Sequence, residues 1–538
     1  ESFWYSRHYC LLSTCAFVSA LQVFILVRYV RKVLITLAQA VTLSSKSLQQ
    51  LAMWLEGSQA LDIFSQNLKH LLLVLVGGAL GGAITFQHFR RKAAADVPKE
   101  VLDLAPARAI VNLAALRHNT RIIQKLTEDL GARVMAVVKA DAYAHGAQRV
   151  AEEMFSCGVR DFAVATVVEG VSLRLSSVLA DANILVFGVP LTGDLPVMLQ
   201  YRLDAMVSSL DTAKMVARDT RSAIQPLRVH VNIETGMVRL GILAGEVQET
   251  LQILGTGKVE IVGLCSHFAE ADSPESDFLS QQLEYFDTAV AQVRAQTSAA
   301  LDIHISNSAA LLDKQFHELI RKYSGGMTRP GLALYGFYPQ VAKRKAEHAL
   351  GSKASRRTGQ RASAFEVKVH DSMDGQLVEA MRFVAKVVQV TVVEANTSVG
   401  YSRTWRAPSR SCIATLGVGY ADGFPRHASS KAYVGIHGRL YPIAGNVCMD
   451  MVMVNLGDPD TCEVQVGDDA CLFGPGGPSV NELAWHSDTI NHAILTGIHP
   501  RVRRIYIDDE DELRRTQRRG SMLPASTEFS EEREIAAQ

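Results

Sequence analysis

Short apolar segments alternate with helical segments through the middle of the chain, and this rhythm restricts the fold more than any other feature. Eight strands are expected, at residues 134–138, 162–165, 184–187, 205–207, 229–233, 261–265, 303–305 and 332–335. Short, fully apolar and β-branched runs are typical of buried parallel strands. Parallel strands that alternate with helices favour an α/β fold, a TIM-like (β/α)8 barrel.

The rest of the chain differs in composition from this barrel region. A further strand is expected at 109–113, and we place the barrel domain at residues 101–340. Residues 341–375 are rich in lysine, arginine, serine and alanine, which indicates a polar insertion or linker. Short segments with glycine and proline turns then predict a mainly β C-terminal domain at 376–510, followed by a charged tail at 511–538.

Residues 1–100 form a separate N-terminal region with two apolar runs. Residues 9–27 and 71–86 carry no charge, and basic residues follow each run. Each run is close to the ~20 residues that a membrane-spanning helix needs. We therefore expect N-terminal hydrophobic helices that associate with a membrane, with the catalytic part intracellular. An organelle-targeting presequence and buried core helices are the alternatives.

Charge and cysteine usage exclude other classes. Lysine plus arginine and aspartate plus glutamate both number 55, so the chain has no net charge and lacks the basic footprint of a nucleic-acid binder. The 8 cysteines show neither metal-ligand spacing nor a dense framework. Reduced thiols in an intracellular compartment are the expected state.

Lys139 stands where an apolar strand gives way to a loop of small and polar residues. Side chains at the carboxyl end of a barrel strand face the mouth, where active sites lie. Tyr143, His145 and Gly146 add a phenol, an imidazole and a flexible backbone. A lysine in such a pocket can lose its proton and form a Schiff base with a carbonyl cofactor. The alternative is a lysine that only extends into water.

The sequence Val-Val-Lys-Ala-Asp-Ala-Tyr-Ala-His-Gly at 137–146 closely resembles the pyridoxal-phosphate signature of the alanine racemase family. The resemblance continues to about Ile507 through further motifs in family order. It implies that Lys139 carries pyridoxal 5'-phosphate and acts as a catalytic base. It also implies that Tyr143 contacts this cofactor.

Two further motifs follow barrel strands. Residues 230–241 resemble the family's Asp-Thr-Gly-Met-Gly-Arg-Leu-Gly, which implies that Arg239 holds the cofactor's phenolic oxygen and the substrate carboxylate. Asn232 stands where many members carry a carbamylated lysine that orients this arginine, and others have asparagine with a bound anion. Residues 265–272 resemble Ser/Thr-His-Phe-Ala-x-Ala-Asp, which implies that His267 lies against the cofactor ring and bonds to the catalytic tyrosine.

The cofactor's phosphate and ring nitrogen have their own motifs. Ser308 lies in a segment that is otherwise an ordinary helix start, and the family implies that it binds the phosphate. Gly331 allows close approach of the backbone. Arg329 cannot give up its proton, so it can only donate to the pyridine nitrogen, which favours proton return over transamination. Pro500 stands where the resemblance places a phosphate-binding tyrosine.

Two motifs in the β domain complete the resemblance. Residues 416–426 resemble Gly-Tyr-x-Asp-Gly, which implies that Tyr420 is the second base. Residues 445–450 resemble Gly-x-x-Cys-Met-Asp, in which the backbone amide of Met449 holds the substrate carboxylate. In the family this tyrosine comes from the partner subunit, so a homodimer with shared active sites is implied.

The predicted function is racemization of L-alanine and D-alanine, an isomerase reaction that supplies D-alanine. A base is needed on each face of the substrate, and we assign Lys139 to the D-enantiomer and Tyr420 to the L-enantiomer. A serine or broad-specificity racemase is the nearest alternative. Related barrel decarboxylases place an acid at the pyridine nitrogen, which Arg329 opposes. A non-catalytic cofactor-binding or scaffold protein would not need both bases.

Overall fold

The computed structural model describes residues 104–271, 278–296, 300–323, 325–338, 376–511 and 514. They fall within one compact unit that extends from Ala94 to Gln538. The expected N-terminal helices at 9–27 and 71–86, the whole linker at 341–375, and all but residues 511 and 514 of the tail lie outside the described residues. Among the described helices, none is long and apolar enough to cross a membrane.

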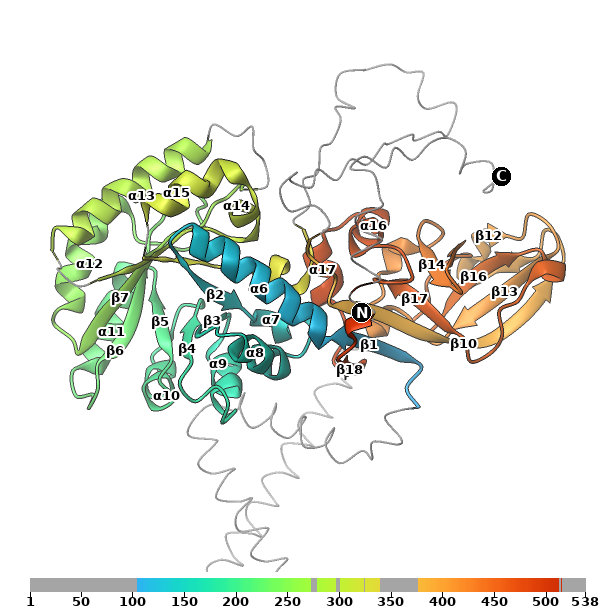
Figure 1. Cartoon of the computed structure of the whole chain (residues 1–538), viewed down its shortest axis with the longest axis horizontal. Helices are drawn as coiled ribbons and strands as arrows, with labels where there is room; N and C mark the ends of the chain where they lie inside the picture. The colour runs from blue at the N-terminus through green and yellow to red at the C-terminus, as the bar shows by residue number, and fades with distance from the viewer. Residues whose placement is uncertain are drawn as a thin grey trace, which may run out of the picture. The chain divides into compact units, whose positions relative to one another are not determined.

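Eight parallel strands form the barrel, as the sequence predicted (Figure 1). They are β2 (Arg133–Val137), β3 (Asp161–Val164), β4 (Asn183–Val186), β5 (Asp204–Val207), β6 (Leu227–Asn232), β7 (Val259–Cys265), β8 (Asp302–His304) and β9 (Met327–Thr328). Their order in the sheet is β8-β7-β6-β5-β4-β3-β2-β9. A backbone hydrogen bond from Arg329 N to Ser306 O, of 3.0 Å, joins the two ends of this order.

Helices alternate with the strands and cover the outside of the barrel (Figure 1). They are α6 (Leu113–Asp129), α8 (Ala147–Ser156), α9 (Val167–Arg174), α10 (Asp194–Gln200), α11 (Leu210–Thr220), α12 (Val247–Leu254), α13 (Phe278–Arg294), α14 (Ser308–Leu312) and α15 (His317–Lys322). In α6, Leu116 and Ile123 are fully buried on the face that packs on the barrel. The helix begins at residue 113 because the Asn112 side chain accepts a hydrogen bond from Ala114 N.

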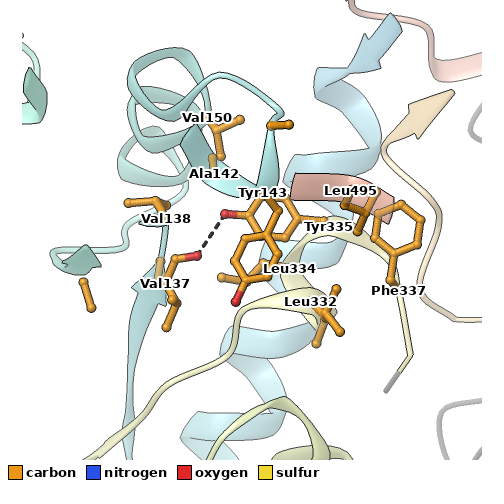
Figure 2. Close-up of a cluster of buried hydrophobic side chains, with 14 of the residues drawn as sticks. Val137, Val138, Ala142, Tyr143, Val150, Leu332, Leu334, Tyr335, Phe337 and Leu495 are labelled. Atoms are coloured by element: carbon orange, nitrogen blue, oxygen red, sulfur yellow. Dashed lines mark hydrogen bonds between the residues drawn. The ribbon is translucent and has the colours of Figure 1, made fainter. Parts of the chain in front are cut away.

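The prediction of a strand at 332–335 is wrong. Leu332–Tyr335 forms the 3-10 helix η3, and the eighth strand is β9, immediately before Arg329. All four side chains of η3 are buried, and the Tyr335 hydroxyl donates to Val137 O at 2.9 Å (Figure 2). A short apolar run is compatible with a strand or with a buried helical turn, so its hydrophobicity could not separate the two.

The first strand also lies in a different sheet from the one expected. β1 (Ala107–Asn112) pairs antiparallel with β10 (Met381–Val393) and parallel with β18 (Arg503–Ile507). It is therefore part of the sheet of the β domain, although it precedes the barrel strands in the sequence. The run is apolar in either sheet, and only pairing with strands from the far end of the chain decides its place.

The C-terminal part is a mainly β domain, as predicted. Its further elements are β11 (Ser398–Val399), β12 (Trp405–Arg406), β13 (Ser411–Leu416), β14 (Tyr433–Ile436), β15 (Arg439–Pro442), β16 (Val452–Gly457), β17 (Asp469–Phe473), α16 (Val480–His486) and α17 (Asn491–Thr496). Its main sheet has the order β15-β14-β17-β10-β1-β18, and β13 pairs with β10 and β16. Phe383 and Phe473 pack in its core, with ring centroids 5.9 Å apart.

The segment α7 (Lys139–Tyr143) is a left-handed turn. From Ala140 to Ala144, five consecutive residues other than glycine have φ between 53° and 63°. A left-handed residue with a Cβ costs roughly 1–2 kcal/mol, so the turn costs roughly 5–10 kcal/mol in backbone strain. Such a turn persists only where surrounding contacts stabilise it.

Contacts from the β domain stabilise this turn. Arg504 on β18 donates from Nε to Ala144 O at 2.9 Å, and Tyr506 donates from its hydroxyl to His145 O at 3.1 Å. The same hydroxyl explains Gly146, because a Cβ there would lie 1.8 Å from Tyr506 Oη. A strand of the C-terminal domain thus supports the loop that carries Lys139.

His145 stabilises the turn from inside. Its Nδ1 lies 3.0 Å from Ala142 O and 2.9 Å from Tyr143 O. Because carbonyl oxygens only accept, Nδ1 must carry the proton. Burial lowers the pKa of His145 to about 4, so the ring is neutral in the folded protein at pH 7.

This neutral ring predicts a loss of stability in acid. The ordinary pKa of histidine is about 6.5, so between that pH and about 4 the unfolded chain binds the extra proton and the folded chain does not. The free energy of unfolding should therefore fall as the pH falls through this window. His145→Asn keeps an amide donor near the position of Nδ1 and removes the titrating group. In this variant the free energy of unfolding should change less steeply with pH, by up to about 1.4 kcal/mol per pH unit.

Urea unfolding at a series of pH values measures these slopes. His427→Asn, which removes an exposed histidine, should keep the parent slope. Equal slopes in the two variants would contradict the prediction.

Candidate active site

A cavity of about 670 Å³ opens at the carboxyl ends of the barrel strands. Seven of the nine residues predicted from the sequence line it, namely Lys139, Tyr143, Arg239, His267, Ser308, Arg329 and Gly331. They lie in the segments that follow β2, β6, β7, β8 and β9, which is where a parallel barrel gathers its functional side chains. Tyr420 and Met449 do not line this cavity.

Lys139 enters the cavity directly after β2. Burial lowers its pKa below the usual range of a lysine, and the positive charges of Arg239 and Arg329 lower it further. The carboxylate of Glu169 acts in the opposite direction. The amine is therefore easier to deprotonate than a surface lysine, as a nucleophile or a base requires.

Arg329 is buried, and the barrel takes up most of its hydrogen-bond donors. Nη1 donates to the Nδ1 of His304 at 2.7 Å and to its carbonyl oxygen. Nη2 donates to Ser266 O at 2.7 Å and to His267 Nδ1 at 3.0 Å. A guanidinium has five N–H groups, and four of them are used here. The Nε–H is then the donor that remains for a ligand in the cavity.

Arg329 also determines the protonation of the histidines around it. An arginine only donates, so His267 and His304 must each accept on Nδ1 and carry their proton on Nε2. His304 Nε2 then donates to His230 Nδ1 at 2.9 Å. The Nε2 of His230 is left facing Asp204 Oδ2, 3.6 Å away at the start of β5. A directed chain of polar groups thus runs through the barrel behind Arg329.

His267 is neutral. Burial, together with the charge of Arg329, lowers its pKa to about 3. With Nδ1 accepting from Arg329, the Nε2–H is the group that can donate to a ligand or a tyrosine. The sequence expectation that His267 bonds to the catalytic tyrosine remains a prediction.

Ser308, Gly331 and Tyr143 lie together in the cavity wall. Ser308 Oγ accepts from Gly331 N at 2.8 Å and from Ala333 N at 3.3 Å, so its own hydrogen can point to a ligand. Burial raises the pKa of Tyr143 to about 12, which keeps the phenol as a donor. Its ring lies 5.0 Å from the ring of Tyr335 (Figure 2). A Cβ on Gly331 would lie 2.4 Å from Tyr143 Oη, so only glycine leaves this space open.

His492 was missed by the sequence analysis. It lies in the first turn of α17, lines the cavity, and has its ring 6.0 Å from the ring of Tyr143. Pro500, which stands where the family has a phosphate-binding tyrosine, is exposed and does not line the cavity. The sequence shows a histidine near the start of a helix, which by itself does not indicate a site. Only the packing of α17 against α7 brings this histidine to the cavity.

The loop that carries Arg239 is held by two polar side chains. Asn232 Nδ2 donates to Leu240 O at 2.9 Å, directly after the arginine. Glu234 Oε1 accepts from Gly236 N and from Val238 N. Val238 adopts a φ of 52° where the family motif has glycine. Asn232 therefore supports the loop through a backbone carbonyl.

Tyr420 and Met449 lie together on the surface of the β domain. Tyr420 N donates to Cys448 O, and Ala421 N donates to Met449 O, both at 3.0 Å. The two side chains are 41% and 54% exposed. The structure brings the two motifs together but leaves Tyr420 open to solvent in its own chain.

The fold and the site define a class of enzyme. A barrel with a lysine of lowered pKa at its mouth, an arginine with one remaining donor, and a serine and a tyrosine in the same wall fits the barrel enzymes that use pyridoxal phosphate. The donor set matches a cofactor with an aldehyde, a ring nitrogen and a phosphate.

Comparison with known proteins identifies the family. The model of the alanine racemase N-terminal domain matches residues 111–339, and that of the C-terminal domain matches residues 380–506. The alanine racemase of Chlorobaculum tepidum is 36% identical over 401 residues, which cover 74% of this chain and 95% of that protein. The Treponema pallidum alanine racemase is 34% identical over 416 residues, 75% of this chain and all of that protein. The chain belongs to the alanine racemase family.

Solved structures of alanine racemases are similar to this chain in fold. The Streptomyces coelicolor alanine racemase matches with a TM-score of 0.64 and 30% identity, covering 76% of this chain and 99% of that one. The Bartonella henselae alanine racemase with covalently bound pyridoxal phosphate matches with a TM-score of 0.60 and 26% identity, covering 75% of this chain and 100% of that one.

The contact of Gly331 with Tyr143 predicts a specific loss of cofactor affinity. In Gly331→Ala the new methyl group must displace the Tyr143 phenol, because the two would lie 2.4 Å apart. Cofactor affinity should fall by roughly tenfold or more, as expected for the loss of one hydrogen bond to a charged group. Equilibrium dialysis of the cofactor-free protein measures it.

Two further variants make this test specific. The double variant Tyr143→Phe/Gly331→Ala should lose less cofactor affinity than the sum of the two single losses. The reason is that the new methyl group clashes with the Tyr143 hydroxyl, which the double variant lacks. Gly193→Ala has no atom within 4 Å of the new Cβ and should bind cofactor like the parent. Additive losses would contradict the proposed contact.

Proposed function

We propose that this chain interconverts L-alanine and D-alanine with pyridoxal 5'-phosphate as cofactor. Membership of the family supports this function over most of the chain. The observation that carries it is the pairing, in one cavity, of Lys139 with Arg329. One supplies an amine of lowered pKa, and the other supplies a donor that cannot release its proton.

The residues present fit the cofactor. Lys139 would hold its carbonyl carbon, the Arg329 Nε–H would donate to its ring nitrogen, and Ser308, Tyr143 and His492 would surround its phosphate. When bound, this cofactor acidifies the Cα proton of an attached amino acid. A guanidinium keeps its proton, so Arg329 leaves the ring nitrogen unprotonated and disfavours side reactions such as transamination. Arg239 would pair with the substrate carboxylate.

Racemization requires two bases, because the two enantiomers present the Cα proton to opposite faces. We assign Lys139 Nζ to the D-enantiomer and Tyr420 Oη to the L-enantiomer. Each base takes the proton on its own side, and the other returns a proton from the opposite side. Reversal of these roles runs the reaction in the other direction.

A homodimer would deliver Tyr420 to the cavity of a second copy, together with the Met449 amide that faces the substrate carboxylate. Around Tyr420, the large side chains of Tyr401, Met449 and Met451 are 72%, 54% and 49% exposed. Hydrogen bonds from Asn446 Nδ2 to Tyr401 O and from Tyr420 N to Cys448 O join their loops. Large apolar side chains that are exposed in neighbouring loops are typical of an interaction site.

Tyr420→Phe tests the division of labour between the bases. The ring and its packing remain, and only the acid–base group is lost. Cα proton exchange from L-alanine should fall by roughly 10²–10⁴-fold, while exchange from D-alanine continues through Lys139. Deuterium uptake from heavy water, measured for each enantiomer separately, gives both rates. Tyr433→Phe, another exposed tyrosine, is the control.

The result separates the alternatives. If L-alanine exchange persists near the parent rate in Tyr420→Phe, the tyrosine is a structural aromatic and the two-base function fails. If the parent exchanges neither enantiomer but binds cofactor, the chain is a non-catalytic binder. Faster exchange with L-serine than with L-alanine would assign a serine racemase.

We propose that residues 1–100 direct this catalytic part to a membrane or an organelle. The uncharged runs at 9–27 and 71–86 support this proposal. Full-length protein should sediment with membranes or be processed in an organelle, whereas a chain that starts at Ala94 should stay in the soluble fraction and keep its activity. A full-length protein that is uncleaved and entirely soluble would contradict the proposal.

A further inference from the structure

Glu169, on helix α9, touches the peptide group that follows Lys139. Its Oε1 accepts a hydrogen bond from Ala140 N at 2.8 Å. Its Oε2 accepts from Ala165 N at 2.7 Å and from Thr166 N at 3.1 Å. One carboxylate therefore binds backbone amides at the carboxyl ends of two neighbouring strands, β2 and β3.

Ala140 is the residue at which the left-handed turn begins, with φ 53° and ψ 49°. Inside the turn, Ala142 N donates to Val138 O and Ala144 N donates to Ala140 O. The amide of Ala140 takes part in neither of these bonds. It donates to the side chain of Glu169 instead. This hydrogen bond holds the peptide between residues 139 and 140 in place and so restrains the backbone from which the lysine side chain leaves.

Glu169 also acts on the charge of the lysine. It raises the pKa of Lys139, whereas burial, Arg239 and Arg329 lower it. Its two oxygens accept hydrogen bonds from three backbone N–H groups, so the carboxylate group is held in a fixed position.

We propose that Glu169 is a positioning residue for Lys139, which fixes the strained turn and thereby aims the amine into the cavity. Its effect on proton transfer rests on the proposed function. The proposal predicts an unequal effect on the two enantiomers, because Lys139 serves D-alanine and Tyr420 serves L-alanine.

The competing explanation is a purely structural one. Glu169 also completes a capping box with Thr166 at the start of α9, and such a residue stabilises a helix without any role at the site. The chain offers a matched control. Glu482 completes the same capping box with Ser479 on α16, in the β domain. Glu169→Gln and Glu482→Gln therefore remove the same charge from the same kind of helix start.

The first measurement compares Cα proton exchange in the two variants. An amide at residue 169 would place an NH₂ group against at least one backbone donor, so the turn should shift. D-alanine exchange should fall by roughly 10–10²-fold, as expected for a misplaced catalytic group, and L-alanine exchange should fall much less. Glu482→Gln should keep the parent ratio of the two rates. An equal fall for both enantiomers in Glu169→Gln, or no fall, would overturn the proposal.

The second measurement needs no bound cofactor and no racemization. Acetylation of Lys139 in cofactor-free protein, followed over pH by peptide mapping, gives the pH at which the amine loses its proton. That midpoint should shift to lower pH in Glu169→Gln and should not move in Glu482→Gln. An unchanged midpoint together with an unchanged D-to-L ratio would leave Glu169 as a helix cap only. If the two-base function fails while the midpoint still shifts, the contact with Lys139 stands and only the assignment of the bases is lost.

Discussion

The strained turn after β2 is the constraint on which the site depends. Five left-handed residues follow Lys139, and none of them is glycine, so the turn cannot persist by local preference. It is held by Glu169 from helix α9, by His145 from inside, and by Arg504 and Tyr506 from β18. The turn after Lys139 is therefore held by parts of the chain that lie far apart in sequence, and the β domain contributes two of these contacts.

One arginine, Arg329, strongly influences the protonation of its neighbours at the site. Because Arg329 can only donate, it determines which nitrogen is protonated in His267, in His304 and, through His304, in His230. Its own burial is compensated by carbonyl oxygens and imidazole nitrogens rather than by an acid. The charge thus stays positive and unneutralised beside Lys139, which lowers the pKa of the amine. Arg329 thus determines the tautomers of the neighbouring histidines and contributes to the lowered pKa of Lys139.

The site is incomplete within one chain. Seven predicted residues share the cavity, but Tyr420 and Met449 lie on an exposed surface of the β domain. The hydrogen bonds between their two loops hold them as one unit, ready to face another surface. A second copy that contributes this unit would close the cavity and add the missing base, which is the simplest use of an exposed patch of tyrosine and methionine.

The amino-acid sequence alone determined the alternation of strands and helices, the two-part architecture and the candidate residues at strand ends. These are consequences of local hydrophobicity and of motif chemistry, and seven of the nine residues do meet in one cavity. Only the tertiary structure decided which sheet β1 joins, that 332–335 is a helical turn, and that His492 reaches the cavity. In each case an apolar or polar segment suits several environments equally well. Long-range pairing and packing select one of them, and neither is encoded in the local pattern.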